Sequence, residues 1–303
     1  MVLAVTALGE DAANVGGVDL IDLLCRGKFM TAGSNEPIWA LIALDSAGYT
    51  VPAGAAWDRQ KLIDRALTYQ NPDNGGFGLN GNDEVGTDMT AMAIQALAPY
   101  RKDPKVQTAI DAGLGYLKHE MDRNCDFGTS ETIAQVIIAL GCLDQDPLDP
   151  ANGFVRSSAR DLVTALCAYK MDDGGFRHLM AENKSQNMST LQALMAFESY
   201  RRVKAGQPNL YDMTEKTDPE KPTEPSEPKP TEPETKPSEP AVTEPSAPGS
   251  RPTGPATQPT KPGGSQNRPA TGDPGAAVYA VGLLVSAAAL AAVVVLGRKK
   301  SRR

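Results

Sequence analysis

The sequence has few residues that build metal sites, and it has no excess of positive charge. It contains two histidines and four cysteines among 303 residues, and no two cysteines have the Cys-x-x-Cys spacing. Zinc sites need clustered cysteine and histidine ligands, so we predict neither a metal nor a cofactor. Lysine and arginine number 30 against 37 acidic residues, which gives a net charge of −7. A chain without a basic face is not expected to bind nucleic acid.

Proline is sparse in the first 212 residues and dense after them. Eight of the 24 prolines precede residue 213, whereas fourteen lie between Pro219 and Pro262. Thr-Glu-Pro and Ser-Glu-Pro recur in that segment, which offers few apolar side chains to bury. We predict a folded domain over residues 1–212. A disordered Pro/Thr/Glu-rich linker over 213–267 is expected to act as an extended stalk.

The last 36 residues combine a pentapeptide, a long apolar run and a basic end. The apolar run, residues 276–296, carries no charge and as a helix spans roughly 30 Å, enough to cross a bilayer once. The basic tail after it is expected to stay in the cytoplasm, which places the preceding chain outside the cell. The pentapeptide, within segment 268–303, reads Arg268-Pro269-Ala270-Thr271-Gly272.

This order of parts resembles the Leu-Pro-x-Thr-Gly cell-wall sorting signal of Gram-positive surface proteins. The resemblance implies that a sortase cuts between Thr271 and Gly272 and joins Thr271 to peptidoglycan. Arg268 stands where leucine is usual, which implies a divergent sortase. The alternative is a membrane anchor that is not cleaved. Both interpretations predict a cell-surface protein, wall-anchored or single-pass with a cytoplasmic C-terminus.

The first residues do not resemble a secretion signal. Residues 2–8 form an apolar run that is too short, without basic residues before it and with Glu10 and Asp11 close behind. Because a sorting signal requires export, we expect the chain to lack its natural start. The run over Val2–Leu8 then represents the end of an inner helix from a preceding repeat.

Four phenylalanines mark an internal repeat. Phe29, Phe77, Phe127 and Phe176 each lie in a short turn, spaced by 48, 50 and 49 residues. Helices with one apolar stripe precede the turns, as at 61–69 and 162–169. More uniformly apolar helices follow the turns, at 39–44, 91–97, 133–140 and 191–197. Uniformly apolar helices are buried and striped ones lie outside them, so the pattern predicts an all-α domain with two layers of alternating helices.

The turns and helix starts carry their own signals. The glycine pairs at 75–76 and 174–175 are typical of reversals that need positive φ. Thr87, Ser130 and Ser189 stand at the starts of apolar helices and are expected to cap their free N–H groups.

Gln70 followed by Gly75-Gly76-Phe77 resembles the Gln-Trp repeat of the α/α-toroid superfamily, with phenylalanine for tryptophan. That superfamily includes squalene and terpenoid cyclases and protein prenyltransferase β subunits. The similarity is greatest to prenyltransferase/squalene-oxidase-repeat proteins on the surface of Gram-positive bacteria. It implies a toroid of helix pairs, and we expect this one to be incomplete at the N-terminus. The vitamin B12 carriers of animals share this fold.

The family's catalytic motifs are mostly missing. The cyclase motif Asp-x-Asp-Asp-Thr-Ala corresponds to Gly86-Thr87-Asp88-Met89-Thr90-Ala91, in which only Asp88 keeps its acid. A single aspartate at a helix N-terminus is stabilised as the anion, so Asp88 is only a weak catalytic candidate. The zinc ligands of prenyltransferases are absent, and His119 and His178 are the only histidines. The oxygen-rich loop after Asn71 is interpreted as turn chemistry and not as a calcium site.

These observations predict a cell-surface-anchored, non-enzymatic binding module. The candidate binding residues lie on the loop face of the toroid: Phe77, Asp88, Phe176 and His178. A small apolar molecule, a corrinoid, and a host or cell-wall component all remain open as the ligand. The alternatives are a terpenoid-cyclase or prenyltransferase-like enzyme acting on an isoprenoid, and a purely adhesive module.

Overall fold

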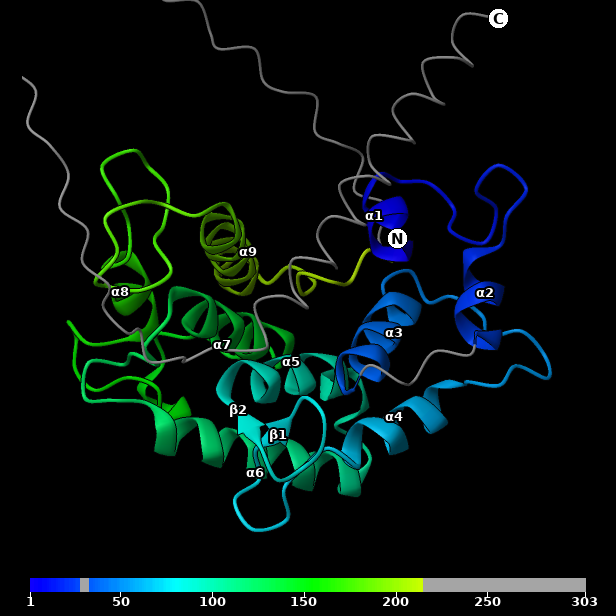
Figure 1. Cartoon of the computed structure of the whole chain (residues 1–303), viewed down its shortest axis with the longest axis horizontal. Coiled ribbons are helices and arrows are strands. Elements are labelled where there is room, and N and C mark those ends of the chain that lie inside the picture. The colour runs from blue at the N-terminus through cyan, green and yellow to red at the C-terminus, as the bar shows by residue number, and fades with distance from the viewer. Residues whose placement is uncertain (28–32, 215–303) are drawn as a thin grey trace, which may run out of the picture. The chain divides into compact units, whose positions relative to one another are not determined.

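The computed structural model describes residues 1–27 and 33–214 of the chain. This part is helix-rich, as predicted, and its only strands are two residues long. About half of its residues are α-helical. The elements in Figure 1 are α1 (Val2–Ala7), α2 (Leu20–Arg26), α3 (Asn35–Asp45), α4 (Arg59–Leu67), β1 (Phe77–Gly78), β2 (Val85–Gly86), α5 (Thr87–Leu97), η1 (Ala98–Tyr100), α6 (Pro104–Glu120), α7 (Ser130–Cys142), η2 (Pro150–Asn152), α8 (Leu162–Cys167) and α9 (Asn187–Lys204).

Several predicted features lie outside the described residues. They are Phe29, the linker beyond Thr214, the pentapeptide Arg268–Gly272 and the apolar run 276–296. Among residues 1–27 and 33–214, no helix combines the length and apolar character needed to cross a bilayer. The stalk, the sorting signal and the membrane helix therefore stay predictions.

Four helices, α3, α5, α7 and α9, form one row in which consecutive members are neighbours (Figure 1). α7 packs most extensively, against both α9 and α5, and α5 also packs against α3. Three outer helices pack against this row: α4 packs on α3, α6 on α5 and α8 on α7. The predicted alternation of inner and outer helices is confirmed over residues 35–167.

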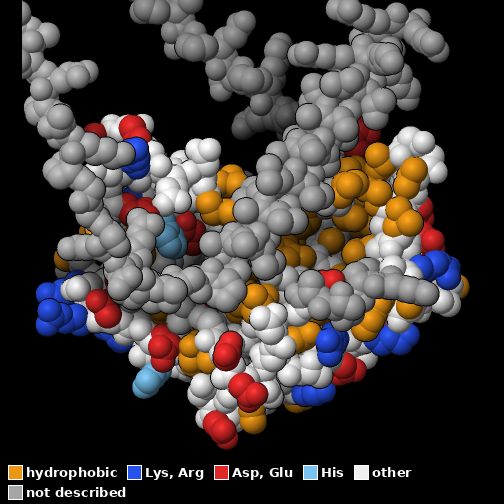
Figure 2. Space-filling model, in the orientation of Figure 1, with side chains coloured by type: hydrophobic (Ala, Val, Ile, Leu, Met, Phe, Trp, Pro, Cys, Tyr) orange, Lys and Arg blue, Asp and Glu red, His pale blue; other side chains and the backbone are white. Residues whose placement is uncertain are grey.

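The inner helices are buried because neighbours surround them. Twelve of the 13 residues of α7 are buried, and Glu131 in its first turn is the exception. In α5, every residue from Met89 to Leu97 is buried. The outer helices α4 and α6 bury one face each, and charged side chains gather over them at the lower edge of Figure 2. Hydrophobic burial of the inner row therefore supplies most of the core.

The last inner helix does not match the prediction. Residues 191–197 were expected to be buried on all sides, but Leu191 is 46% and Leu194 is 59% exposed. Only Ser189, Ala193, Ala196 and Ser199 of α9 are buried. The reason is that, among the described helices, α7 alone packs extensively on α9, so the opposite face stays uncovered.

Two turns share one hydrogen-bond pattern. The backbone N–H of Phe77 donates to Thr90 Oγ1 at 2.8 Å, and that of Phe176 donates to Thr190 Oγ1 at 2.9 Å. Each threonine lies in the first turn of an inner helix and donates to the carbonyl group four residues earlier, at 2.7 and 2.8 Å. One hydroxyl thus fastens each turn to the helix that follows it.

The turn that leads to Phe127 has a cysteine, Cys125, where the turns that lead to Phe77 and Phe176 have glycine. Gly75 and Gly174 have φ of +80° and +87°, and Cys125 has φ of 63°. The Cys125 side chain is fully buried and its thiol donates to the carbonyl oxygen of Arg160 at 3.1 Å. Burial raises the pKa of this thiol. All four cysteine thiols of the chain are free.

The predicted helix caps are wrong. The residues that precede α5, α7 and α9 are Gly86, Thr129 and Gln186, and the Thr129 hydroxyl accepts from the N–H of Thr132 at 3.2 Å. Thr87 and Ser130 are the first residues inside their helices, and Ser189 is the third in α9. Their hydroxyls therefore stand inside the first turn, and those of Ser130 and Ser189 make contacts between elements.

A charged cluster near the end of α9 makes stability depend on acidity. Glu198 accepts hydrogen bonds from Arg201 at 2.8 and 2.9 Å and from Arg202 at 2.8 Å. The bonds from Arg201, followed by those from Arg202, lower the pKa of Glu198 to about 2. The stabilisation is therefore present above the unfolded pKa of about 4.3 and is lost as the pH falls towards about 2.

We expect Glu198→Gln to lower the free energy of unfolding by less than about 1 kcal/mol above pH 5, because exposed ion pairs contribute little. The difference from the wild type should vanish near pH 2. Urea unfolding followed by circular dichroism at several pH values measures it. A difference that stays constant across this range would contradict the ion-pair origin.

Candidate functional site

The two phenylalanines predicted to contact a ligand are core residues. Phe77 is 0% and Phe176 is 4% exposed, and the Phe176 ring packs against Phe197 with a centroid distance of 5.9 Å. Packing covers both rings in this structure, so their role as binding residues gains no support and stays a prediction. Phe77 and Phe176 anchor their turns to the inner helices.

Asp88 lies in the first turn of α5 and is partly buried. A Cβ atom at Gly86 would approach Asp88 Oδ1 to 2.9 Å, so the glycine makes room for this carboxylate. The charge of Asp88 also reaches Tyr116 on α6. Burial first, then Glu120 and Asp88, raise the pKa of the Tyr116 phenol. A helix N-terminus favours the anion, so the position does not suit a strong general acid.

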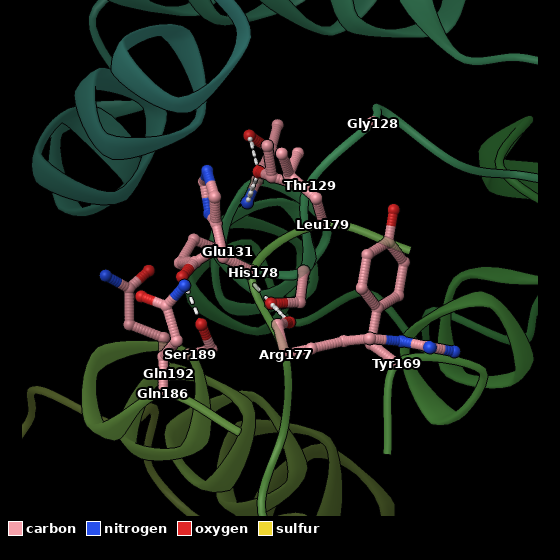
Figure 3. Close-up of polar contacts among 12 residues, drawn as sticks. Gly128, Thr129, Glu131, Tyr169, Arg177, His178, Leu179, Gln186, Ser189 and Gln192 are labelled. Atoms are coloured by element: carbon pink, nitrogen blue, oxygen red, sulfur yellow. Dashed lines mark hydrogen bonds and ion pairs between the residues drawn. The ribbon is translucent and has the colours of Figure 1, made fainter. Parts of the chain in front are cut away.

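His178 is the one sequence candidate that the structure places in a polar cluster (Figure 3). Its Nδ1 atom lies 2.8 Å from Glu131 Oε2, although the two residues are 47 positions apart in the chain. The Glu131 side chain is 16% exposed and that of His178 is 41% exposed. The carboxylate is thus sheltered at the start of α7 while the imidazole stays open to solvent.

The carboxylate also contacts a serine from α9. Ser189, which is fully buried, donates its hydroxyl to Glu131 Oε1 at 2.5 Å. The carboxylate therefore lies between the serine and the histidine. In a serine hydrolase the histidine lies between the serine and the acid and removes the serine proton. The order here does not activate Ser189 as a nucleophile, and it holds the imidazole in place instead.

The backbone of His178 is held from two further sides. Its N–H donates to Glu182 Oε2 at 3.1 Å, and its carbonyl accepts from the N–H of Ser130 at 3.2 Å. The Ser130 hydroxyl also donates to the neighbouring carbonyl of Arg177 at 2.8 Å. Partial burial raises the pKa of Glu182, but hydrogen bonds from Gln186 and from the backbone of His178 and Leu179 outweigh it, so the pKa is lowered. The segment that contains Arg177 and His178 is thus held against the start of α7.

The pairing with Glu131 decides what the imidazole can offer. A carboxylate only accepts, so the neutral ring carries its proton on Nδ1 and presents the lone pair of Nε2. Within residues 1–27 and 33–214, Nε2 of His178 has no hydrogen-bond partner. In Figure 3, Gln186 and Gln192 lie on the same side of the cluster as Ser189. Nε2 can therefore accept a proton, accept a hydrogen bond or ligate a metal that a ligand brings.

The chain's own residues do not form a complete metal site. In the part of the chain that the structure describes, no three side chains of His, Cys, Asp or Glu come close enough together to hold an ion. His178 and Glu131 supply one nitrogen donor and its supporting carboxylate only. A metal would have to arrive with most of its ligands already in place.

Sequence reasoning identified His178 but missed its partner Glu131 and Ser189, which donates to Glu131. Glu131 had a signal, since it is the only charged residue of α7, whose other residues are buried. For Ser189 the sequence contained no signal beyond its position near the start of a helix. No protein-family model matches this chain, and comparison with curated proteins finds no match. The chemistry of this cluster therefore rests on its geometry.

Proposed function

We propose that this chain is a surface-displayed binding module built on an α/α toroid of helix pairs. The repeated turn supports the toroid, because Phe77 with Thr90 and Phe176 with Thr190 take the same arrangement. Repeats that are connected by equivalent turns stack on one another with the same geometry. Gln70 adds support: its Nε2 donates to the carbonyl of Ala109 on the next outer helix at 2.8 Å.

The surface location is supported by the sequence alone. The order of pentapeptide, apolar run and basic tail favours export, cleavage between Thr271 and Gly272 by a sortase, and attachment to peptidoglycan. The membrane would be crossed through residues 276–296 before cleavage. The stalk over 213–267 would hold the binding domain away from its anchor.

The geometry around His178 favours a corrinoid among the candidate ligands. A histidine that ligates a metal almost always gives its other ring N–H to a carboxylate or carbonyl, which orients the ring and raises its basicity. Glu131 stands in that place, at 2.8 Å from Nδ1. A corrinoid carries most of its cobalt ligands in its own ring, so one imidazole suffices. This pairing of Glu131 with an open Nε2 is the observation that carries the proposal.

The enzymatic alternative has weaker support. A terpenoid cyclase needs an acid strong enough to protonate an alkene, and Asp88 lies at a helix N-terminus, where the anion is favoured. Phe77 and Phe176 are buried and cannot stabilise a carbocation in a cavity. We therefore place a non-catalytic ligand at His178.

We expect the protein to bind aquacobalamin, the form of vitamin B12 with water as axial ligand, and to change its visible absorption as imidazole replaces water. Replacing His178 with alanine should abolish the spectral change. Glu131→Gln should weaken binding roughly 10- to 100-fold, since it removes the supporting carboxylate. Titration followed by absorption spectroscopy measures both effects.

His119 provides the matched control. It pairs with Glu120 at 2.9 Å, as His178 pairs with Glu131, but its side chain is 85% exposed on α6. His119→Ala should leave the titration unchanged. If the wild type causes no spectral change, the corrinoid proposal fails. If His178→Ala binds like the wild type, the ligand occupies another site.

Anchoring is tested separately by mass spectrometry of protein released from purified cell wall. A C-terminal peptide that ends at Thr271 would support sorting. Intact peptides that run through residues 276–296 would contradict it and leave an uncleaved membrane anchor.

A further inference from the structure

The segment after α9 runs back to the end of α3. We call residues 205–214 the strap. At its start, the N–H of Gln207 donates to the carbonyl of Arg202 at 2.9 Å, and Arg202 Nη1 donates to the carbonyl of Asn209 at 3.2 Å. At its end, the N–H of Met213 donates to the carbonyl of Ser46 at 2.7 Å. The strap thus connects α9 to α3, two helices without extensive contact of their own among the described residues.

Tyr211 is the only residue of the strap that is buried within the core, at 9% exposure. Its hydroxyl donates to Gln95 Oε1 at 3.1 Å, and its ring meets the ring of Trp39 edge-on at 6.1 Å. Burial raises the pKa of the phenol, so it remains a hydrogen-bond donor at ordinary pH. An element without regular structure therefore supplies a core side chain to α3 and α5.

The Tyr211 hydroxyl begins a chain of side-chain amides across the inner row. Gln95 Nε2 donates to Gln135 Oε1 at 2.8 Å and to its backbone carbonyl at 2.9 Å. Gln135 Nε2 donates to Gln192 Oε1 at 2.9 Å. Such a network stabilises the core when every acceptor is used, and loses that benefit when one partner leaves. Without Tyr211, Gln95 Oε1 would need a new donor.

The strap also forms one wall of a cavity of about 370 Å³. Pro208, Asn209 and Tyr211 of the strap line it together with Gln95 and Cys142. Cys142 is 5% exposed, and burial raises the pKa of its thiol to about 12. While the strap is in place, this thiol is therefore both covered and almost entirely protonated.

We propose that the strap is a releasable latch, which closes the end of the inner row when Tyr211 is docked and opens the cavity around Gln95 and Cys142 when it leaves. Few backbone bonds hold it, and segments of this kind open at a lower free energy than the helices they cover. The chain continues from Thr214 towards the proline-rich segment. If the protein is anchored as proposed above, a pull through that segment reaches the strap before any helix of residues 1–27 and 33–214.

The thiol of Cys142 reports directly on release. The full chain is treated with N-ethylmaleimide, and the labelling rate of each cysteine is measured by mass spectrometry. Tyr211→Ala should raise the rate at Cys142 by about tenfold or more, since it removes the anchor and leaves a buried acceptor unpaired. Cys25 and Cys125, which are 1% and 0% exposed elsewhere in the fold, should keep their rates.

A second variant leaves the tyrosine in place. Met213→Pro removes the N–H that donates to the carbonyl of Ser46 and should also raise the labelling rate of Cys142. Tyr200→Ala on α9 should leave that rate unchanged. An unchanged rate at Cys142 in Tyr211→Ala would overturn the latch. Equal acceleration at Cys25, Cys125 and Cys142 would overturn it as well, because Tyr211 would then be an ordinary core residue whose loss unfolds the domain. The aquacobalamin titration tests the proposed function separately, so failure of the latch and failure of the corrinoid proposal can be told apart.

Discussion

Replacing Phe77 with alanine will lower the free energy of unfolding by about 3–5 kcal/mol, the range for a large aromatic side chain removed from a core. The ring is 0% exposed and lies in the turn that leads into α5. Its own backbone N–H stays bonded to Thr90, so the turn keeps its direction while its apolar anchor is lost. A cavity left in a closely packed core collapses only in part.

Two other positions give the reference for this measurement. Phe127 occupies the corresponding turn of the third repeat but is only partly buried, so Phe127→Ala should have a smaller effect than Phe77→Ala. Leu194 is 59% exposed on α9, and Leu194→Ala should change stability by no more than about 0.5 kcal/mol. Urea unfolding followed by circular dichroism compares all three. A loss at Phe77 no larger than that at Leu194 would contradict its role as an anchor.

Gly75→Ala will destabilise the protein far more than Gly174→Ala, although the two glycines occupy equivalent turns. Both have positive φ, +80° and +87°, which costs an L-residue roughly 1–2 kcal/mol. At Gly75 a Cβ atom would also lie 2.5 Å from the carbonyl oxygen of Ala112 and 2.8 Å from its Cβ. At Gly174 a Cβ would meet nothing within 4 Å.

The added term at Gly75 is a backbone clash with α6, and relieving it requires the turn and the helix to move apart. Overpacking of this kind costs about 1–3 kcal/mol beyond the φ term. The movement would also strain the bond from Gln70 to the carbonyl of Ala109, which fastens the same turn to α6. Urea unfolding of Gly75→Ala and Gly174→Ala gives the difference. Equal losses would mean that the turn does not press against α6.

Local patterns in the sequence were enough to predict the order of inner and outer helices over residues 35–167, but not the exposed face of α9. The apolar run from Ile133 to Leu140 has no polar face, and it became the centre of α7. The glycines before Phe77 and Phe176 marked where the chain reverses. These signals succeed because helix periodicity and positive φ depend on residues within a few positions of one another.

The candidate site was only partly predictable for the opposite reason. Phe77 and Phe176 looked like binding residues because they stand in loops, but packing covered both rings. Loop position says where a residue stands along the chain, and it does not say whether neighbouring helices close over its side chain.

The sequence by itself determined which segments are helical, where they turn, and that three of the described turns repeat around a phenylalanine. Only the tertiary structure decided that Glu131 meets His178 across 47 residues and Ser189 across 58. It likewise decided that Tyr211 reaches Gln95 across 116 residues. Such contacts depend on which helix faces which and in what register. That choice is made by packing the whole row at once, and no local period in the chain encodes it.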